Sequence, residues 1–291
     1  MRPPLVIVAA VVAAAALLAS ACSSDSGSSS SPPSTAVPTT LAPSDSVASA
    51  DTVELTAQTE ADCPREGEEL DTAKLYIEHN ATDGDTGVHG LFGGEAWSQL
   101  CIWDPSGELI FWVDPRNQLD DLTVADFFFE SREPENTELP IAELTAAFPE
   151  GDYLVGGIDF EGVPRVASAR FTHAIPAEPV ITDPPLVEDP ESVSEAVVPA
   201  AGLVVTWEPV TETVDGQPVT VTAYEVIVTN DEHDDADGLS RPVYDVHVGP
   251  DQTSLSVPEE FFSEGVIYEL EVLALEDSGN QTIGLGFFTV A

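Results

Sequence analysis

The chain contains 291 residues, with 53 Asp and Glu against 8 Lys and Arg and a formal net charge of −45. This length accommodates two domains of about 100 residues plus unstructured segments, and the 43% hydrophobic content indicates folded material with an acidic surface. Because proteins bind nucleic acid mainly through Lys and Arg that neutralise phosphates, the charge excludes nucleic acid as a partner. The acidity is consistent with solubility in salty surroundings or, alternatively, with weak Ca²⁺ or Mg²⁺ binding by clustered carboxylates.

Residues 1–22 have the pattern of an export signal. A single positive charge at Arg2 precedes an apolar core at residues 5–18, which is shorter than the roughly 20 residues that a membrane-spanning helix needs. The next four residues, Ala19-Ser20-Ala21-Cys22, resemble a bacterial lipobox. The resemblance implies that Cys22 carries lipid and anchors the protein to the outer face of a membrane. Cleavage of an ordinary signal and free secretion is the alternative.

Residues 23–59 are expected to form a disordered tether. They are dominated by Ser, Thr, Pro and Ala, and such a segment cannot bury enough apolar surface to offset the entropy of ordering. The tether would hold the globular part of the chain away from the membrane.

Residues 60–175 are predicted to form a first β-sandwich. Turn residues separate runs with strand character at 73–78, 87–92, 97–103, 108–113, 152–160 and 165–174. Residues 140–148, which begin with Pro140, form the one plausible helix. Cys63 and Cys101 are an isolated cysteine pair in an exported chain, which predicts a disulfide.

The turn at residues 104–107, Asp-Pro-Ser-Gly, predicts a hairpin in which Trp103 lies opposite Glu108. One face of this hairpin would be apolar core, and the other mixes tryptophans with polar groups. Large aromatic side chains beside hydrogen-bonding groups on an open sheet face can stack sugar rings, so an extracellular polysaccharide is the candidate ligand. Alternatively, the segment around Cys63 or the second domain covers these tryptophans. The ligand-binding candidates are Trp97, Gln99, Trp103, Glu108 and Trp112.

Two acidic segments have spacing similar to calcium loops. The segment at 80–87 places Asp83 and Asp85 two residues apart, with glycines at 84 and 87 for sharp turns, but a full site needs six to eight oxygens. It is therefore interpreted as either a weak metal site or an acidic turn. The run at 231–238, with His233, Asp235 and Asp237, is interpreted as a solvated loop. No cofactor is predicted, and Ca²⁺ remains the open alternative.

Five prolines in residues 176–190 predict that the segment 176–191 is an extended spacer between domains. Residues 192–291 resemble a fibronectin type III domain. The resemblance assigns strand B to 203–207, C to 224–228, E to 253–258, F to 268–274 and G to about 282–290. Independently, alternation of apolar residues with Glu269 and Glu271 after Tyr268 gives one buried and one solvated face.

Each predicted sandwich contains a turn followed by a tyrosine, at Tyr153 and Tyr268. This spacing is typical of a tyrosine corner, in which the hydroxyl bonds back to the turn backbone. Trp207 and Tyr224 are the other structural residues that the resemblance implies for the second core. The sequence thus predicts an all-β chain with two tandem immunoglobulin-like sandwiches.

No nucleophile elbow, zinc-protease motif or phosphate loop is present, so no enzyme is predicted. The chain resembles uncharacterised exported bacterial proteins that carry a C-terminal fibronectin type III domain. The leading hypothesis is a non-catalytic binding or adhesion lipoprotein of the cell surface, with a polysaccharide or an envelope protein as partner. A structural spacer or protein–protein interaction module is the alternative, and an accessory protein of an exported hydrolase is less favoured.

Overall fold

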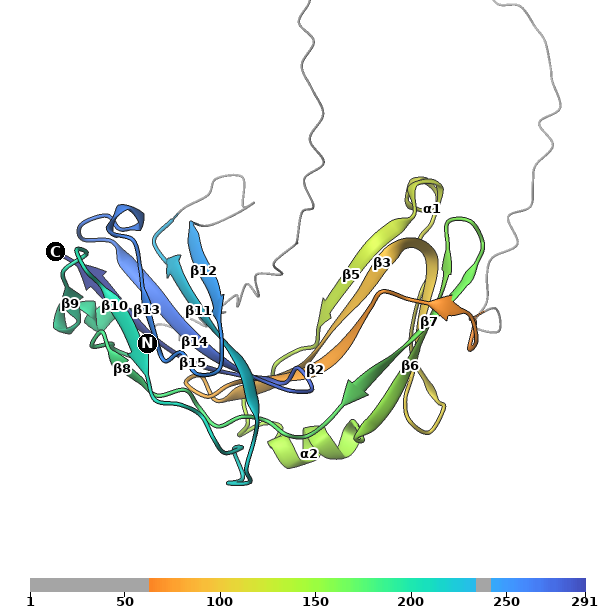
Figure 1. Cartoon of the computed structure of the whole chain (residues 1–291), viewed down its shortest axis with the longest axis horizontal. Coiled ribbons are helices and arrows are strands. Elements are labelled where there is room, and N and C mark those ends of the chain that lie inside the picture. The colour runs from red at the N-terminus through yellow and green to blue at the C-terminus, as the bar shows by residue number, and fades with distance from the viewer. Residues whose placement is uncertain (1–62, 234–241) are drawn as a thin grey trace, which may run out of the picture. The chain divides into compact units, whose positions relative to one another are not determined.

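The computed structural model describes residues 63–233 and 242–291 (Figure 1). The predicted signal peptide, Cys22 and the whole predicted tether lie outside the described residues, as do Asp235 and Asp237. Within the described ranges, no helix is both long enough and apolar enough to cross a membrane. The chain is all-β, with two immunoglobulin-like sandwiches, as the sequence predicted.

The first sandwich contains seven strands and two short helices. They are β1 (Glu68–Glu69), β2 (Thr72–Asn80), β3 (Asp85–Trp103), β4 (Leu109–Val113), α1 (Gln118–Leu122), β5 (Val124–Glu130), α2 (Ile141–Ala147), β6 (Gly151–Asp159) and β7 (Pro164–Phe171). The helix α2 lies within the segment where the sequence predicted one. Strands β1 and β5 and helix α1 were not predicted.

Strand β3 combines two predicted strands because it bends between them. Its first half pairs with β2 and β5, and its second half pairs with β4 and β6. Glycines permit the bend: Gly94 has φ of 118°, and a Cβ at Gly93 would lie 2.3 Å from an Asp126 carboxylate oxygen. Figure 1 shows β3 as a strongly curved ribbon that serves both sheets of the sandwich.

The core of the first sandwich lies between these sheets. Leu75, Ile77, Leu100 and Ile102 are among its buried members. Tyr153 is buried in the same cluster and its hydroxyl donates to the Pro149 carbonyl at 3.0 Å, which is the geometry of a tyrosine corner. The Cys63–Cys101 disulfide, with 6.2 Å between the Cα atoms, confirms the predicted pair.

The second sandwich packs a three-stranded sheet on a four-stranded one. The small sheet has the order β13-β10-β8, and the larger one contributes β15-β14-β11-β12. These strands are β8 (Ile181–Asp183), β9 (Val197–Val198), β10 (Val204–Trp207), β11 (Val221–Asn230), β12 (Val243–Val248), β13 (Ser254–Ser256), β14 (Ile267–Glu276) and β15 (Gln281–Val290), with 3₁₀ turns η2 (Pro190–Glu195) and η3 (Glu259–Phe261). All five predicted strands are present.

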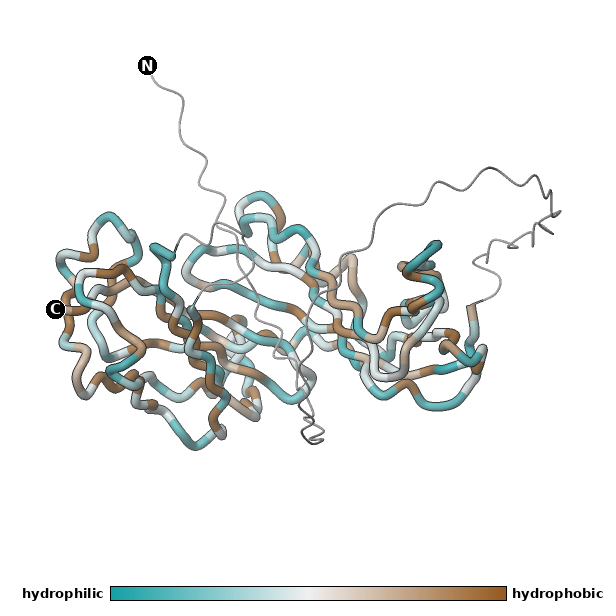
Figure 2. The backbone as a smooth tube through the Cα atoms, turned by 90° about the horizontal axis from the view of Figure 1, so that it is seen from above, coloured by the Kyte–Doolittle hydropathy of each residue, from teal (hydrophilic) through white to brown (hydrophobic). Residues whose placement is uncertain are grey.

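The strands of the second sandwich bury alternate residues, and hydrophobic and hydrophilic positions alternate along the tube in Figure 2. Tyr224, Tyr268 and Trp207 lie in its apolar cluster. The Tyr268 hydroxyl accepts from the backbone N–H of Ser263, and the Tyr224 hydroxyl accepts from that of Val210, both at 2.7 Å. Tyr153 and Tyr268 therefore belong to separate apolar clusters.

The proline-rich segment 176–191 is not the free spacer that the sequence predicted. It contains β8, which pairs with β10, and Ala177, Ile181, Leu186 and Val187 pack against the second core. Proline is tolerated in sheets at edge positions, and β8 is the end strand of the order given above. The segment thus forms part of the second sandwich.

The two sandwiches share one continuous sheet. Strand β15 pairs in parallel with β2, with Gln281 opposite Glu78, Thr282 opposite His79 and Ile283 opposite Asn80. The described residues, 63–233 and 242–291, accordingly belong to one compact unit. We call this contact between β2 and β15 the joint.

Candidate metal centre

A buried histidine, His89, lies on the face of β3 that points away from the first core. It pairs with Tyr76 across the β2–β3 hairpin and is fully buried. Its ring makes edge-on contacts with Tyr76 and Phe128, at centroid distances of 5.4 and 5.7 Å. These aromatic contacts fix the imidazole in one orientation.

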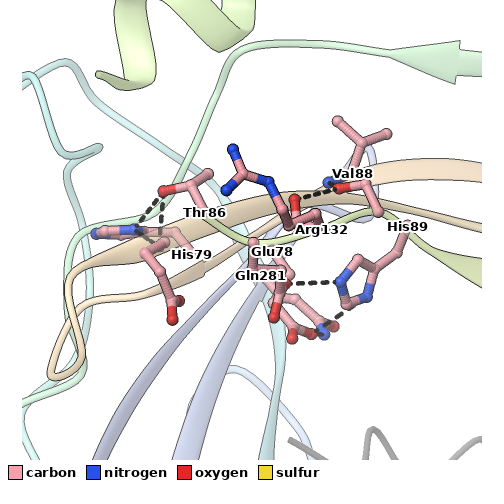
Figure 3. Close-up of polar contacts among 10 residues, drawn as sticks. Glu78, His79, Thr86, Val88, His89, Arg132 and Gln281 are labelled. Atoms are coloured by element: carbon pink, nitrogen blue, oxygen red, sulfur yellow. Dashed lines mark hydrogen bonds and ion pairs between the residues drawn. The ribbon is translucent and has the colours of Figure 1, made fainter. Parts of the chain in front are cut away.

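Two carboxylates flank the His89 ring. Its Nε2 lies 2.9 Å from Glu133 Oε1, and its Nδ1 lies 3.7 Å from Glu78 Oε2. Glu78 is 2% exposed, whereas the Glu133 side chain is 12% exposed. We call these three residues the His89 cluster. Figure 3 shows Glu78 and Gln281 beside the imidazole.

The ionisation of the His89 cluster follows from burial and mutual charge. Burial raises the pKa of Glu78, while the neighbouring His89 opposes that shift. Burial by itself lowers the pKa of His89, but the Glu133 hydrogen bond and the charge of Glu78 outweigh it, so its pKa is raised. The two carboxylates therefore stabilise positive charge beside the ring, whether a proton or a bound cation carries that charge.

The His89 cluster lies at the joint. The Gln281 amide of β15 donates to Glu78 Oε2, so a residue of the second sandwich contacts a cluster built on the first. The preceding residue, Asn280, is fully buried, and its Oδ1 accepts a hydrogen bond from the Ile77 backbone N–H at 2.8 Å. The position of the cluster thus depends on both sandwiches.

The sequence-predicted metal candidates lie near this cluster. The Asp83 carboxylate accepts from the Asn80 amide at 3.0 Å, within the turn after β2. One Asp85 oxygen is buried without a hydrogen-bond partner among the described residues. Burial, with the charges of Glu133, Asp83 and Glu78, raises the pKa of Asp85 to about 7. Asp83 and Asp85 do not converge with further oxygens into a calcium site among the described groups.

The prediction of an open tryptophan face is wrong for two of its three tryptophans. Trp97 is 1% exposed and Trp103 is 3% exposed, while Trp112 is 39% exposed. Gln99 is also buried, whereas Glu108, in the hairpin turn, is exposed.

Two local features explain this burial. A register shift between Trp97 and Gln99 turns Trp97 into the first core, against Phe127. Trp103 is covered by the segment after Cys63, because the Arg65 guanidinium lies 4.6 Å from its ring centroid. A shift next to Trp103 also places Leu109, not Glu108, opposite it. Coverage by the disulfide segment was the alternative that the sequence left open.

A second group of ionisable residues lies on β11 and β12. His247 Nε2 is 3.1 Å from Glu225 Oε1, and Asp245 completes the group. The His247 side chain is half exposed. Burial and the Asp245 charge raise the pKa of Glu225 to about 8.

No family model matches the chain. No curated protein sequence matches it. The chain is similar to a two-domain fibronectin type III segment of chicken tenascin, with 12% identity over 75% of this chain and 99% of that one and a TM-score of 0.27. It is also similar to the FN1–FN3 domains of chicken CNTN1, with 14% identity, 77% and 68% coverage and a TM-score of 0.25.

A third similar structure comes from a study of host cell surface retention of a 1.5-MDa bacterial ice-binding adhesin. It has 14% identity, covers 77% of this chain and 66% of that one, and has a TM-score of 0.24. Likenesses at these scores carry no argument about fold or function. The fold described above rests on the strand pairings and the two apolar clusters.

Sequence reasoning missed the His89 cluster because its members come from separate elements. Glu78 and His89 lie on neighbouring strands of one hairpin, but Glu133 follows the unpredicted strand β5. The one available signal was polar residues on one face of two neighbouring predicted strands, at Tyr76, Glu78 and His89. That pattern marks a face outside the apolar core.

Proposed function

We propose that the chain is a non-catalytic module of the cell surface, in which two sandwiches joined as one stiff body present a binding surface or act as a spacer. The observation that carries this proposal is the parallel pairing of β15 with β2 at the joint. Tandem domains linked only by a flexible segment move independently by default. A shared sheet restricts that movement because its hydrogen bonds are directional.

Side-chain hydrogen bonds support the stiffness of the joint. The Asn280 amide nitrogen donates to Thr172 O at 3.0 Å and to its Oγ1 at 3.1 Å, while Asn280 Oδ1 accepts from Ile77. Thr172 also contacts Ser278, with 2.6 Å between the hydroxyl oxygens. The turn between β14 and β15 is thereby bound to strand β2 and to the residue that follows β7.

Further bonds extend the joint on both sides. Thr282, whose backbone lies opposite His79, is itself held in place within the second sandwich, because its Oγ1 donates to the Pro176 carbonyl at 2.6 Å. The Ala81 N–H donates to the Ile283 carbonyl at 3.0 Å, and the Leu285 N–H donates to Thr82 Oγ1 at 3.0 Å. Because these groups are buried or partly buried, breaking the joint would leave polar atoms unsatisfied.

The attachment to the cell is proposed from the sequence alone. Two acyl chains on Cys22 would hold the protein stably on the outer face of a membrane, and residues 23–59 would separate the sandwiches from it. Mass spectrometry of the mature chain tests this attachment. A mature N-terminus other than lipidated Cys22 would contradict it.

An envelope protein is the partner that this architecture favours, and a polysaccharide is the second candidate. Only Trp112 of the predicted tryptophan face is substantially exposed, and Ile110 is the other exposed large residue on the same face of β4. One aromatic ring beside an aliphatic side chain is a smaller stacking surface than the one predicted. If glycans quench the tryptophan fluorescence of the wild type and this quenching is lost in Trp112→Ala, the polysaccharide is favoured as the partner. If no glycan of a broad panel changes the fluorescence, the polysaccharide hypothesis is rejected.

Distance measurements between two spin labels, one on each sandwich of the full chain, test the stiff body. We expect a narrow distribution in the wild-type protein and a broader one in Asn280→Ala. Asn230→Ala is the matched control, because Asn230 accepts a hydrogen bond from Glu232 within the second sandwich. A wild-type distribution as broad as that of Asn280→Ala would overturn the proposal.

A further inference from the structure

The unsatisfied nitrogen of His89 is the starting observation. The ring is fully buried, and its Nδ1 has no hydrogen-bond partner among the described groups. A buried polar atom without a partner is costly, and in a folded protein it calls for an explanation such as a bound ion. This nitrogen points toward the buried carboxylate of Glu78, 3.7 Å away.

The spacing between these two atoms fits a shared metal ion. Two ligands held about 2.0–2.2 Å from a tetrahedral Zn²⁺ lie roughly 3.4 Å apart. The observed 3.7 Å between His89 Nδ1 and Glu78 Oε2 therefore accommodates an ion with a shift of a few tenths of an ångström. A direct hydrogen bond would instead require a shorter distance.

Glu133 completes the arrangement expected around a metal-binding histidine. Its Oε1 lies 2.9 Å from His89 Nε2, so Nε2 carries the proton and donates it to the carboxylate. That bond leaves the Nδ1 lone pair directed at Glu78 in the neutral ring. Histidines that bind metals commonly donate their other N–H to a carboxylate, which fixes the tautomer and the ring orientation.

The charge balance also favours a cation. Among the residues that the structure describes, no Lys or Arg forms an ion pair with Glu78, Glu130 or Glu133. Glu130 lies opposite His89 in register and is exposed, so its side chain is free to turn toward an ion. Two carboxylates with one neutral imidazole leave an excess negative charge that a divalent ion would neutralise.

We propose that His89 Nδ1 and Glu78 Oε2 bind a divalent transition-metal ion of the Zn²⁺ or Mn²⁺ class, with Glu133 as the outer carboxylate. Mixed nitrogen and carboxylate ligands suit these ions, whereas Ca²⁺ prefers oxygen ligands alone. Water and the Glu130 carboxylate would occupy the remaining positions. Because Gln281 contacts Glu78, the ion would also stabilise the joint.

Isothermal titration of the chelator-treated full chain with Zn²⁺, Mn²⁺ and Ca²⁺ tests the site. We expect one Zn²⁺ or Mn²⁺ per chain and binding of Ca²⁺ weaker by about tenfold or more. Glu78→Gln and His89→Gln should abolish binding, and Glu133→Gln should weaken it about tenfold. His247→Gln, which changes the group on β12, is the matched control and should bind as the wild type does.

A second measurement uses only the wild-type chain, so its result does not depend on whether a variant folds. Paramagnetic Mn²⁺ added to the wild-type chain should broaden the backbone amide signals of Ile77–His79 and Val88–Gly90 before all others. No broadening at these amides, unchanged binding in His89→Gln, or loss of binding in His247→Gln alone would each overturn the proposal. The first two results would leave His89 as a protonated bridge between two carboxylates.

Discussion

Phe288 and Thr282 lie on the same strand, β15, and both are fully buried, but their surroundings are opposite in kind. Phe288 packs in the second core beside Tyr268 and Phe262, with ring centroids 5.7 and 5.9 Å away. Thr282 lies at the joint and donates to a backbone carbonyl. One end of the strand is stabilised by burial of apolar area and the other by directional hydrogen bonds, so the two ends should respond differently to substitution.

The largest effect is expected in the apolar region. Phe288→Ala removes a fully buried ring and should lower the free energy of unfolding by about 3–5 kcal/mol. Phe287→Ala is the matched control, because the neighbouring ring lies on the opposite, partly exposed face, and it should cost about 1 kcal/mol. Urea unfolding measures both. Equal losses of unfolding free energy in the two variants would contradict the assignment of Phe288 to the buried face of β15 and of Phe287 to the partly exposed face.

The next largest effect concerns the disulfide that closes the first sandwich. Replacing Cys63 and Cys101 by Ala should cost about 2–4 kcal/mol of unfolding free energy. It should also release the segment that covers Trp103, since Arg65 lies on that ring. A red shift of tryptophan emission in the folded variant checks this release. Unchanged emission would mean that Trp103 is covered without the disulfide.

The outer face of the second sandwich should make the stability depend on pH. Glu225 faces Asp245, His247 and Glu271, and its pKa is raised to about 8 from an ordinary 4.5 by burial, the Asp245 charge and the more distant Glu78. Because the folded state then binds more protons than the unfolded state, stability is greatest below about pH 4.5 and falls as the pH rises toward about 8.

Glu225→Gln removes the contribution of Glu225 to this dependence and should be more stable than the wild type at pH 8, by about 2 kcal/mol. The measurement is urea unfolding at pH 5 and pH 8. Glu264→Gln, at an exposed position, is the control and should leave the difference between the two pH values unchanged. A wild-type protein that is more stable at pH 8 than at pH 5 would contradict the predicted fall of stability with rising pH.

The apolar regions could be predicted from the sequence better than the polar ones. Alternation around Tyr268 predicts β14 because burial of every second side chain leaves a period of two. Strand β5 was missed because its consecutive Phe127, Phe128 and Phe129 hide that period: the outer two pack on the core, and the middle one contacts His89.

Two other differences have local physical causes. The burial of Trp97 could not be predicted, because one register shift in β3 reverses the face on which a residue lies. The prolines of 176–191 indicated a linker, but Pro176 accepts a hydrogen bond from Thr282 and the segment supplies an edge strand. Its tertiary contacts override the local preference of proline for loops.

The smallest effect tests the joint itself. Thr282→Val keeps the shape of the side chain and removes the bond from its hydroxyl to Pro176 O, which should cost about 1 kcal/mol plus the penalty of an unpaired carbonyl. Thr289→Val is the matched control, because the Thr289 hydroxyl donates to Val266 O at 2.8 Å at the other end of β15, away from the pairing with β2. Both variants should lose similar stability in urea, but only Thr282→Val should accelerate amide hydrogen exchange at Ala81, whose N–H bonds to Ile283 O across the joint. Equal exchange at Ala81 in the two variants would mean that the paired backbone of β2 and β15 holds the joint without Thr282.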